Sequence, residues 1–457
     1  MSVRTIEPGL GAEAPTRPEA VRWQPITRIL VRFGLLYFGL FALLTQVILE
    51  FPGLAVVVRP IVVDWPQPVV RWVGRTGFGI AATHRDSGSG DTAYDWVLLF
   101  CILVTAVAGT AVWSVLDRKR TEYRRAASWL LVFVRVCLAV TMLSYGFVKA
   151  FPLQMPSPSL TRLLEPYGDL TPMSVLWSQV GVSPVYEILL GVAEILCGVL
   201  LLVPRTAVAG ALLTVVCAAQ VWILNMTYDV PVKILSFHIL LMALVLVAPE
   251  ARRITAVLLG NAVGPSTAPQ ALRTSRQRRI GTGIQVGLLI WLTVVGTISG
   301  VISLQQREST SELYGIWEVG SFIRDGQSVP ALLDDEIRWR RVVFDRRDTA
   351  DIQMMNDRFH PVRADIGADL RQLLLRPLSD PDSAAPWAHL AVEQLAPNQL
   401  RLTGEVDGHP VTMELTRFDS RRFTLRQSGF HWVHEYPDNN CVSGRPACPA
   451  PAGSAAR

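Results

Sequence analysis

Polar side chains interrupt three long apolar runs in the middle of the chain, and they are the first candidates for chemistry. The runs cover residues 185–203, 207–224 and 232–247, each close to the length that crosses a bilayer. An ionisable group inside lipid is costly, so it usually faces a bundle interior or a cavity and marks a functional site. Such groups could hold a polar headgroup or move a proton. The candidate polar pocket comprises Lys149, Glu187, Glu194, Asn225, Asp229, Lys233 and His238.

The rise of about 1.5 Å per helical residue predicts that these side chains form one outward-facing pocket. Lys149 and Asn225 come at the outer ends of their spans. Glu187 and Lys233 come at the outer starts of the next ones, which is the same level. Glu194 follows Glu187 by two helical turns on the same face. We therefore expect a polar funnel with Glu194 near its floor, linked to Lys149 through a water or a ligand headgroup.

Structural roles compete with functional ones at several of these positions. Glu194 could pair with a basic residue such as Arg135 and simply join two helices. Asp229 and Lys233 have the spacing of a local ion pair and cap in the first turn of a helix. His238 could be a satisfied core histidine instead of a proton carrier. Sequence alone leaves both interpretations open.

The composition places the chain among polytopic membrane proteins that carry some soluble mass. Of its 457 residues, 50% are hydrophobic and 18% are charged. The net charge of +5 reflects basic clusters beside apolar runs, chiefly in residues 117–125 and 249–282, as in cytoplasmic loops. This predicts a multi-pass protein of the cell membrane with a cytoplasmic N-terminus and an extracytoplasmic C-terminal domain. The lipid bilayer is then an expected partner, and nucleic acid is not.

About seven spans followed by an antiparallel β domain form the expected fold class, an α-helical polytopic membrane protein. Apolar runs near 29–49, 96–116, 129–148 and 284–304 add four spans to the three above. The expected parts are a flexible cytoplasmic tail (1–25), a two-span segment with an extracytoplasmic interfacial loop (26–127), a four-helix bundle (128–250), a basic cytoplasmic loop (251–282), the seventh span (283–304), an extracytoplasmic β-rich domain (305–440) and a Pro/Gly/Ala-rich tail (441–457).

Short alternating segments after residue 305 predict an antiparallel sheet or a small barrel. Residues 400–406 and 411–415 flank Asp407-Gly408, the favoured two-residue turn of a hairpin. Residues 339–344 and 422–426 are expected to form further strands. Gly315-Ile316-Trp317 opens the first strand and resembles the Gly-x-Trp of lipocalin-like barrels, although a Trp in an ordinary strand would look the same.

The polar tail carries the remaining candidates. Cys441 and Cys448 lie on the side expected to be extracytoplasmic, where disulfides persist, and we expect a disulfide between them. His431 and His434 would point to opposite faces of a strand, so no metal site is expected there with Glu435. The other four cysteines lie inside apolar runs and are expected to be small core residues: Cys101, Cys137, Cys197 and Cys217.

The third to sixth spans resemble the DoxX family of small four-helix membrane proteins. The matching features are Arg135, then Gly146-Phe-Val-Lys149, then Gly191-Val-Ala-Glu194-Ile-Leu-Cys-Gly198, with Pro204-Arg-Thr206 after it. The resemblance covers about residues 128–250. The appended C-terminal domain looks like that of a longer bacterial subgroup of the family. It implies a link to quinone-coupled sulfur oxidation and to redox-defence membrane complexes.

We therefore expect a component of a quinone-linked membrane redox system. Lys149 or Lys233 would hydrogen-bond a quinone carbonyl, and Glu194 or His238 would carry the proton. No haem-ligand pair or redox dithiol is visible in the sequence, so quinone is the one cofactor considered and a membrane redox partner would be needed. The alternative is a non-enzymatic scaffold or binding protein whose outer β domain captures a partner or a lipid.

Overall fold

A computed structural model describes most of the chain, which divides into two compact units. One unit comprises Met1–Tyr145 with Ala193–Val295, and the other comprises Gly146–Val192 with Gly296–Arg457. The described residues are 23–45, 55–85, 87–266, 268–269, 271–272, 274–308, 313–367, 369–378, 386–427 and 432–433.

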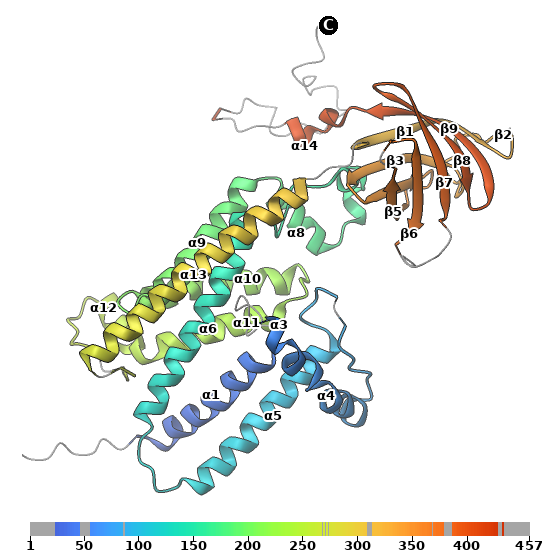
Figure 1. The fold of residues 1–457 in the computed structure, drawn as a ribbon. Helices are drawn as coiled ribbons and strands as arrows, with labels where there is room; N and C mark the ends of the chain where they lie inside the picture. Colours follow the sequence, from blue (N-terminus) through green and yellow to red (C-terminus); the bar gives the residue numbers. More distant parts are fainter. Residues whose placement is uncertain are drawn as a thin grey trace, which may run out of the picture. The chain divides into compact units, whose positions relative to one another are not determined.

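Seven helices in the described part of the chain are long and apolar enough to cross a membrane, which confirms the predicted number (Figure 1). Their 18-residue windows have mean hydropathies between 1.7 and 2.2. The first helix begins four residues before the predicted start, and the last one extends beyond both predicted ends. The spans are α1 (Pro25–Leu44), α5 (Ala93–Leu116), α6 (Arg124–Ala150), α9 (Pro184–Leu202), α10 (Ala207–Thr227), the continuous stretch Lys233–Leu258 that begins with α11 (Lys233–Val247), and α13 (Ser275–Glu308).

Short helices fill the connection between α1 and α5, where the sequence predicts an interfacial piece. They are α3 (Ala55–Arg59), η1 (Pro60–Asp64), α4 (Gln67–Val73) and η2 (Gly74–Phe78). Trp65 and Trp72 are 72% and 66% exposed on them, as expected of aromatic anchors at a membrane–water interface. Thr92 and Asp95 then form a capping box that starts α5.

Other short helices follow the spans. In the loop between α6 and α9 lie α7 (Leu160–Leu164), η3 (Tyr167–Asp169) and α8 (Pro172–Gly181). After α11 the chain continues through η4 (Ala248–Glu250) into α12 (Ala251–Leu258). These segments connect the spanning helices without adding a further one.

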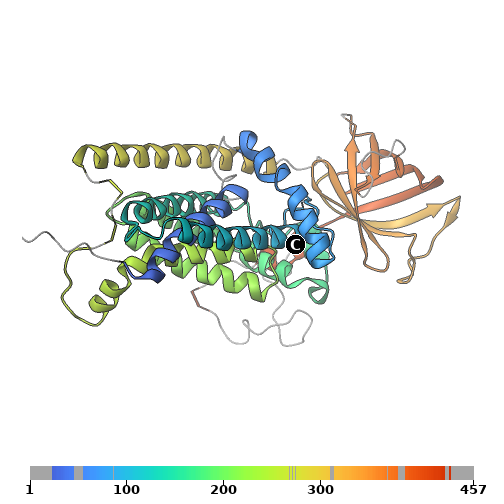
Figure 2. The ribbon, with the colours of Figure 1, turned by 90° about the horizontal axis from the view of Figure 1, so that it is seen from below.

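Nine strands form one antiparallel sheet that closes into an eight-stranded barrel (Figures 1 and 2). β1 pairs with β3, and each strand from β3 to β8 pairs with the next one. β1 also pairs with β9 to complete the ring, while β2 pairs with the end of β1 outside it. Closure gives each of the eight described ring strands a partner on both sides. The strands are β1 (Gly315–Arg324), β2 (Gln327–Ser328), β3 (Trp339–Arg346), β4 (Thr349–Met354), β5 (Phe359–Ile366), β6 (Gln372–Pro377), β7 (Ala388–Ala396), β8 (Gln399–Val406) and β9 (His409–Phe418).

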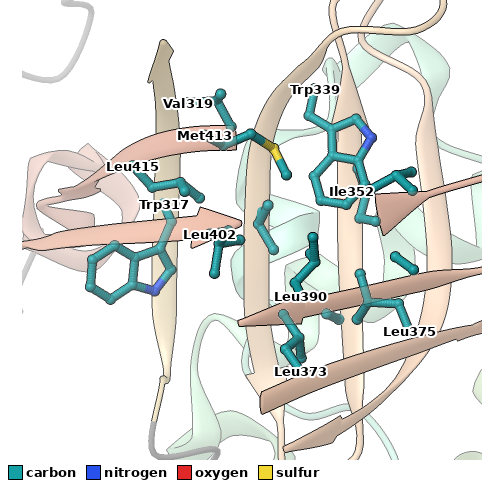
Figure 3. Packing of buried hydrophobic residues seen from close by; sticks show 14 of the residues in the cluster. Trp317, Val319, Trp339, Ile352, Leu373, Leu375, Leu390, Leu402, Met413 and Leu415 are labelled. Atoms are coloured by element: carbon teal, nitrogen blue, oxygen red, sulfur yellow. The ribbon is translucent and has the colours of Figure 1, made fainter. Parts of the chain in front are cut away.

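Apolar side chains fill the barrel interior (Figure 3). Alternate residues of each strand point inward, so Leu373, Leu390 and Met413 are fully buried. Trp339 stacks on Trp387, with ring centroids 5.7 Å apart. A small barrel of this strand number has just enough room for its own side chains. The interior is therefore a packed core.

The predicted hairpin is confirmed, and one predicted strand is wrong. Asp407 and Gly408 both have positive φ, as a type I′ turn requires, and they join β8 to β9. Residues 422–426 do not form a strand: the chain turns through η5 (Ser420–Arg422) into the short helix α14 (Thr424–Gln427). The Asp419 carboxylate accepts the N–H of Arg421, which favours this turn. Since β9 already pairs on both sides, the barrel has no place for another strand.

Candidate functional site

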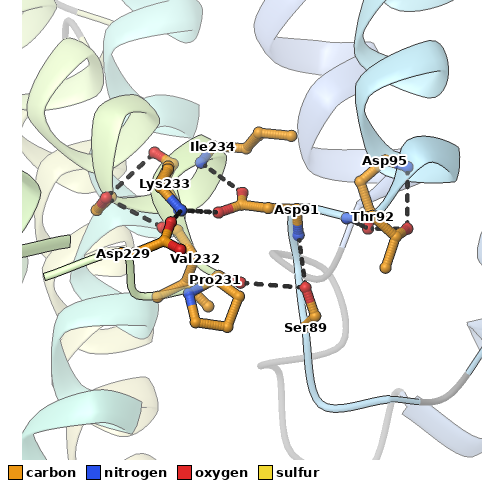
Figure 4. A network of polar contacts seen from close by, with 10 residues as sticks. Ser89, Asp91, Thr92, Asp95, Asp229, Pro231, Val232, Lys233 and Ile234 are labelled. Atoms are coloured by element: carbon orange, nitrogen blue, oxygen red, sulfur yellow. Dashed lines mark hydrogen bonds and ion pairs between the residues drawn. The ribbon is translucent and has the colours of Figure 1, made fainter. Parts of the chain in front are cut away.

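Asp91 organises the polar residues near the start of α11 (Figure 4). Its carboxylate accepts the backbone N–H of Lys233 at 2.6 Å and that of Ile234 at 2.9 Å. These two groups belong to the first turn of the helix, where N–H groups have no partner within the helix. Asp91 precedes the α5 cap in sequence, so one carboxylate fastens the start of α5 to the start of α11. Sequence analysis missed this residue because nothing local links it to a helix 142 residues away.

Asp229 and Lys233 form the ion pair that their spacing suggested. The Lys233 ammonium lies 2.8 Å from Asp229 and 3.9 Å from Asp91. The Asp229 side chain is 84% exposed, so this pair is a surface contact of small energetic weight. The helix cap that the sequence assigned to the pair is supplied by Asp91 instead.

His238 has both ring nitrogens bonded within the helices. Its Nδ1 lies 2.6 Å from the carbonyl oxygen of Ile234, and its Nε2 lies 2.7 Å from the hydroxyl of Tyr37. A neutral imidazole satisfies both contacts when Nδ1–H donates to the carbonyl and Nε2 accepts from Tyr37. The ring also stacks on Phe41, with centroids 3.9 Å apart. This geometry is that of a satisfied core histidine.

Glu187 and Lys149 come together in the other unit. Glu187 is fully buried, and its Oε1 accepts the backbone N–H of Gln154 at 3.1 Å and of Met155 at 2.9 Å. Its Oε2 is buried and has no hydrogen-bond partner among the described residues. Lys149 is 6% exposed, and its charge acts on Glu187 together with that of Arg307. The result is a buried carboxylate with one oxygen bonded to a loop and with two cationic groups that act on its charge.

The two remaining candidates, Glu194 and Asn225, belong to the first unit. Glu194 is 6% exposed on α9. Asn225 is 5% exposed on α10, and its Nδ2 has no hydrogen-bond partner in the described part of the chain. Arg135 donates to the amide of Gln285 at 2.7 Å when that amide takes its favourable orientation. Whether Glu194 shares a pocket with Lys149 stays a prediction.

The structure also shows a contact between the α6–α9 loop and the barrel. Thr161 donates its hydroxyl to Asp351 at 2.6 Å, and Leu160 is fully buried against Ile316 and Val343. Burial raises the pKa of the Asp351 carboxyl, and it raises that of Asp345, which accepts a backbone bond from Leu160. These carboxyls were not recognised from sequence, since they lie in segments that look like ordinary barrel strands.

A cavity of about 270 Å³ lies within the first unit. It is bounded by parts of α1, α5 and α11, by the short helices before α5, and by the segment that leads to Asp91. None of its lining residues belongs to the candidate polar pocket predicted from sequence. The tail candidates Cys441, Cys448, His431, His434 and Glu435 lie outside the described residues.

Comparison with known proteins identifies one relative. Over 128 residues the chain is 30% identical to the uncharacterized protein YwoB of Bacillus subtilis (strain 168), a stretch that covers 26% of this chain and 75% of YwoB. The chain therefore belongs to the same family as YwoB. No family model and no solved structure matches it.

Proposed function

We propose that this member of the YwoB family is a DoxX-like multi-pass membrane protein that serves a quinone-linked redox system, with Lys149 and Glu187 at its ligand site. The supporting observation is the buried Glu187 carboxylate, whose Oε2 has no hydrogen-bond partner among the described residues. A buried polar atom without a hydrogen-bond partner is costly, and an ionisable group in a spanning helix usually marks a functional site.

The chemistry of the pair suits a quinone headgroup. The Lys149 ammonium can donate to a quinone carbonyl, and Glu187 Oε2 can accept or release a proton beside it. Oε1 meanwhile holds the loop backbone at Gln154 and Met155, which fixes the direction of the carboxylate. The chain supplies binding and proton handling in this proposal, and a membrane partner supplies the electron transfer.

Close helix packing supports the DoxX-like part of the proposal. A Cβ at Gly191 would lie 2.5 Å from the Ala150 nitrogen and 2.6 Å from the Gly146 oxygen. Any larger residue would push α9 away from α6. Gly191 therefore allows α9 to approach the end of α6 at Lys149.

Glutamine at position 187 gives a sharp test, because its carbonyl oxygen can still accept the two loop N–H groups. We expect full-length wild-type protein, purified in mild detergent, to retain quinone in an organic extract. Glu187→Gln should lose most of that quinone at an unchanged yield of folded protein. Asp229→Asn is the matched control, since Asp229 is exposed and its loss should leave the quinone content unchanged. Wild-type protein without quinone, or a Gln variant that retains it, would refute the proposal.

A scaffold or binding role is the second candidate, and the barrel supports it. Trp317 closes part of the interior: its Nε1 donates to the Leu313 oxygen at 2.9 Å, and the Arg417 guanidinium lies 5.8 Å from its ring. This arrangement supports a lipocalin-like form of the barrel, but the interior is occupied by side chains. A captured partner or lipid would therefore bind the outer surface. Purified protein that lacks quinone and still co-purifies a stoichiometric partner would favour this role.

A further inference from the structure

The cavity in the first unit has two chemically different sides. Its apolar side is formed by side chains of the spanning helices, among them Phe41, Leu98 and Leu235. Its polar side includes Arg59, His84 and Arg85, which come from the segment between α1 and α5. An apolar wall beside a cluster of basic groups is complementary to an amphiphile with a negatively charged head.

Two carboxylates of the described residues, one in the lining and one just after it in sequence, are bonded at helix starts. Asp95 lines it, but its carboxylate accepts the backbone N–H of Thr92 at 2.8 Å and the Thr92 hydroxyl at 2.5 Å. Asp91 is bonded to the first turn of α11. Among the described residues of the lining, the two guanidinium groups of Arg59 and Arg85 outnumber the one carboxylate of Asp95, and this balance favours an anion.

The short helices that precede α5 carry side chains typical of a membrane–water interface. Val69 and Trp72 of α4 and the nearby Trp65 are more than half exposed, and they sit beside exposed Arg75. Aromatic side chains of this kind prefer the headgroup layer of a bilayer. α4 also packs against α5, one wall of the cavity. A lipid-derived molecule could therefore enter with its head at the level of Arg85 and its chain along α1, α5 and α11.

We propose that this cavity binds an anionic amphiphile, a molecule with a carboxylate or phosphate head and one hydrocarbon chain. Arg59 and Arg85 bind the head through charge-assisted hydrogen bonds, with His84 beside them. Phe41 and Leu98 contact the first part of the chain. A volume of about 270 Å³ accommodates a head and part of a chain, and the rest of the chain extends into lipid. The site lies in a different unit from Glu187 and does not depend on the quinone proposal.

The test measures displacement of a fluorescent fatty acid from the full-length protein in nanodiscs of zwitterionic lipid. Dodecanoate and dodecyl phosphate are the competitors, and dodecanol is the neutral control with the same chain. We expect one or both anions to compete at least about tenfold better than dodecanol, the difference made by one or two charge-assisted bonds. The better anion identifies the head as carboxylate or phosphate.

Substitutions locate the effect. The double variant Arg59→Gln with Arg85→Gln should weaken binding of the better anion at least about tenfold. Leu98→Trp should also weaken it by filling the apolar side. Arg75→Gln is the matched control, since it removes an interfacial charge that does not line the cavity, and it should change binding less than about twofold. Equal competition by dodecanol, or equal losses in the control and in the double variant, would overturn the proposal.

Discussion

Removing the carboxylate of Asp91 should loosen the start of α11. Asp91 is 7% exposed in its side chain and accepts two backbone N–H groups, at 2.6 and 2.9 Å. A capping side chain stabilises a helix by about 0.5–2 kcal/mol, and a negative charge at a helix N-terminus adds about 0.3–1 kcal/mol. We therefore expect Asp91→Ala to cost about 2 kcal/mol. Asp91→Asn keeps an acceptor oxygen without the charge and should cost about half as much.

Hydrogen exchange of the full-length protein in detergent measures this loss locally. A cost of about 2 kcal/mol corresponds to about 30-fold faster exchange in the first turn of α11. Asp229→Asn serves as the control, because the Asp229 side chain is 84% exposed and pairs with the Lys233 side chain, not with the backbone of the first turn. An exposed ion pair is worth at most about 1 kcal/mol, so the control should exchange only a few times faster. Wild-type exchange in Asp91→Ala, or equal effects at the two positions, would refute the capping argument.

Three further outcomes are expected. Tyr37→Phe leaves the buried Nε2 of His238 without its donor and should lower the unfolding free energy in detergent by about 1–3 kcal/mol. Burial raises the pKa of Asp351 although the hydrogen bond from Thr161 acts in the opposite direction, so the contribution of this carboxyl to stability is complete below the ordinary value of 3.8 and is lost as pH rises through the raised pKa. Asp351→Asn should therefore flatten the loss of thermal stability as the pH is raised above about 4. If the C-terminal domain is extracytoplasmic, an impermeant reagent should label Asp325→Cys in intact cells whose protein lacks the two tail cysteines; protection from labelling would reverse the topology.

Much of the fold could be predicted from sequence because its signals are local. Apolar run length predicts each spanning helix, since the bilayer thickness sets it. Asp407-Gly408 predicts the β8–β9 turn, since few other pairs adopt two positive φ angles. The error at residues 422–426 has the opposite cause. Whether an alternating segment forms a strand depends on a free sheet edge, and β1 already occupies that edge of β9.

The candidate site shows the same division. Sequence identified Glu187 and His238 as buried polar residues, because ionisable groups in apolar runs are conspicuous. It could not supply their partners: Tyr37 is 201 positions from His238, and the loop N–H groups that bind Glu187 are more than 30 positions away. A bond over such separations depends on how the chain folds back, which no local pattern records.

The sequence by itself determined the number of spanning helices, the hairpin chemistry and the presence of costly charges in apolar surroundings, since each follows from the energetics of short segments. Only the tertiary structure decided that Asp91 caps α11, that Asp229 stays at the surface, and that a cationic cavity lies beside α5. The physical reason is that burial and pairing belong to surfaces assembled from distant segments. The residue type determines whether a side chain is charged, whereas the free-energy cost of burying that charge and its role depend on the groups packed around it.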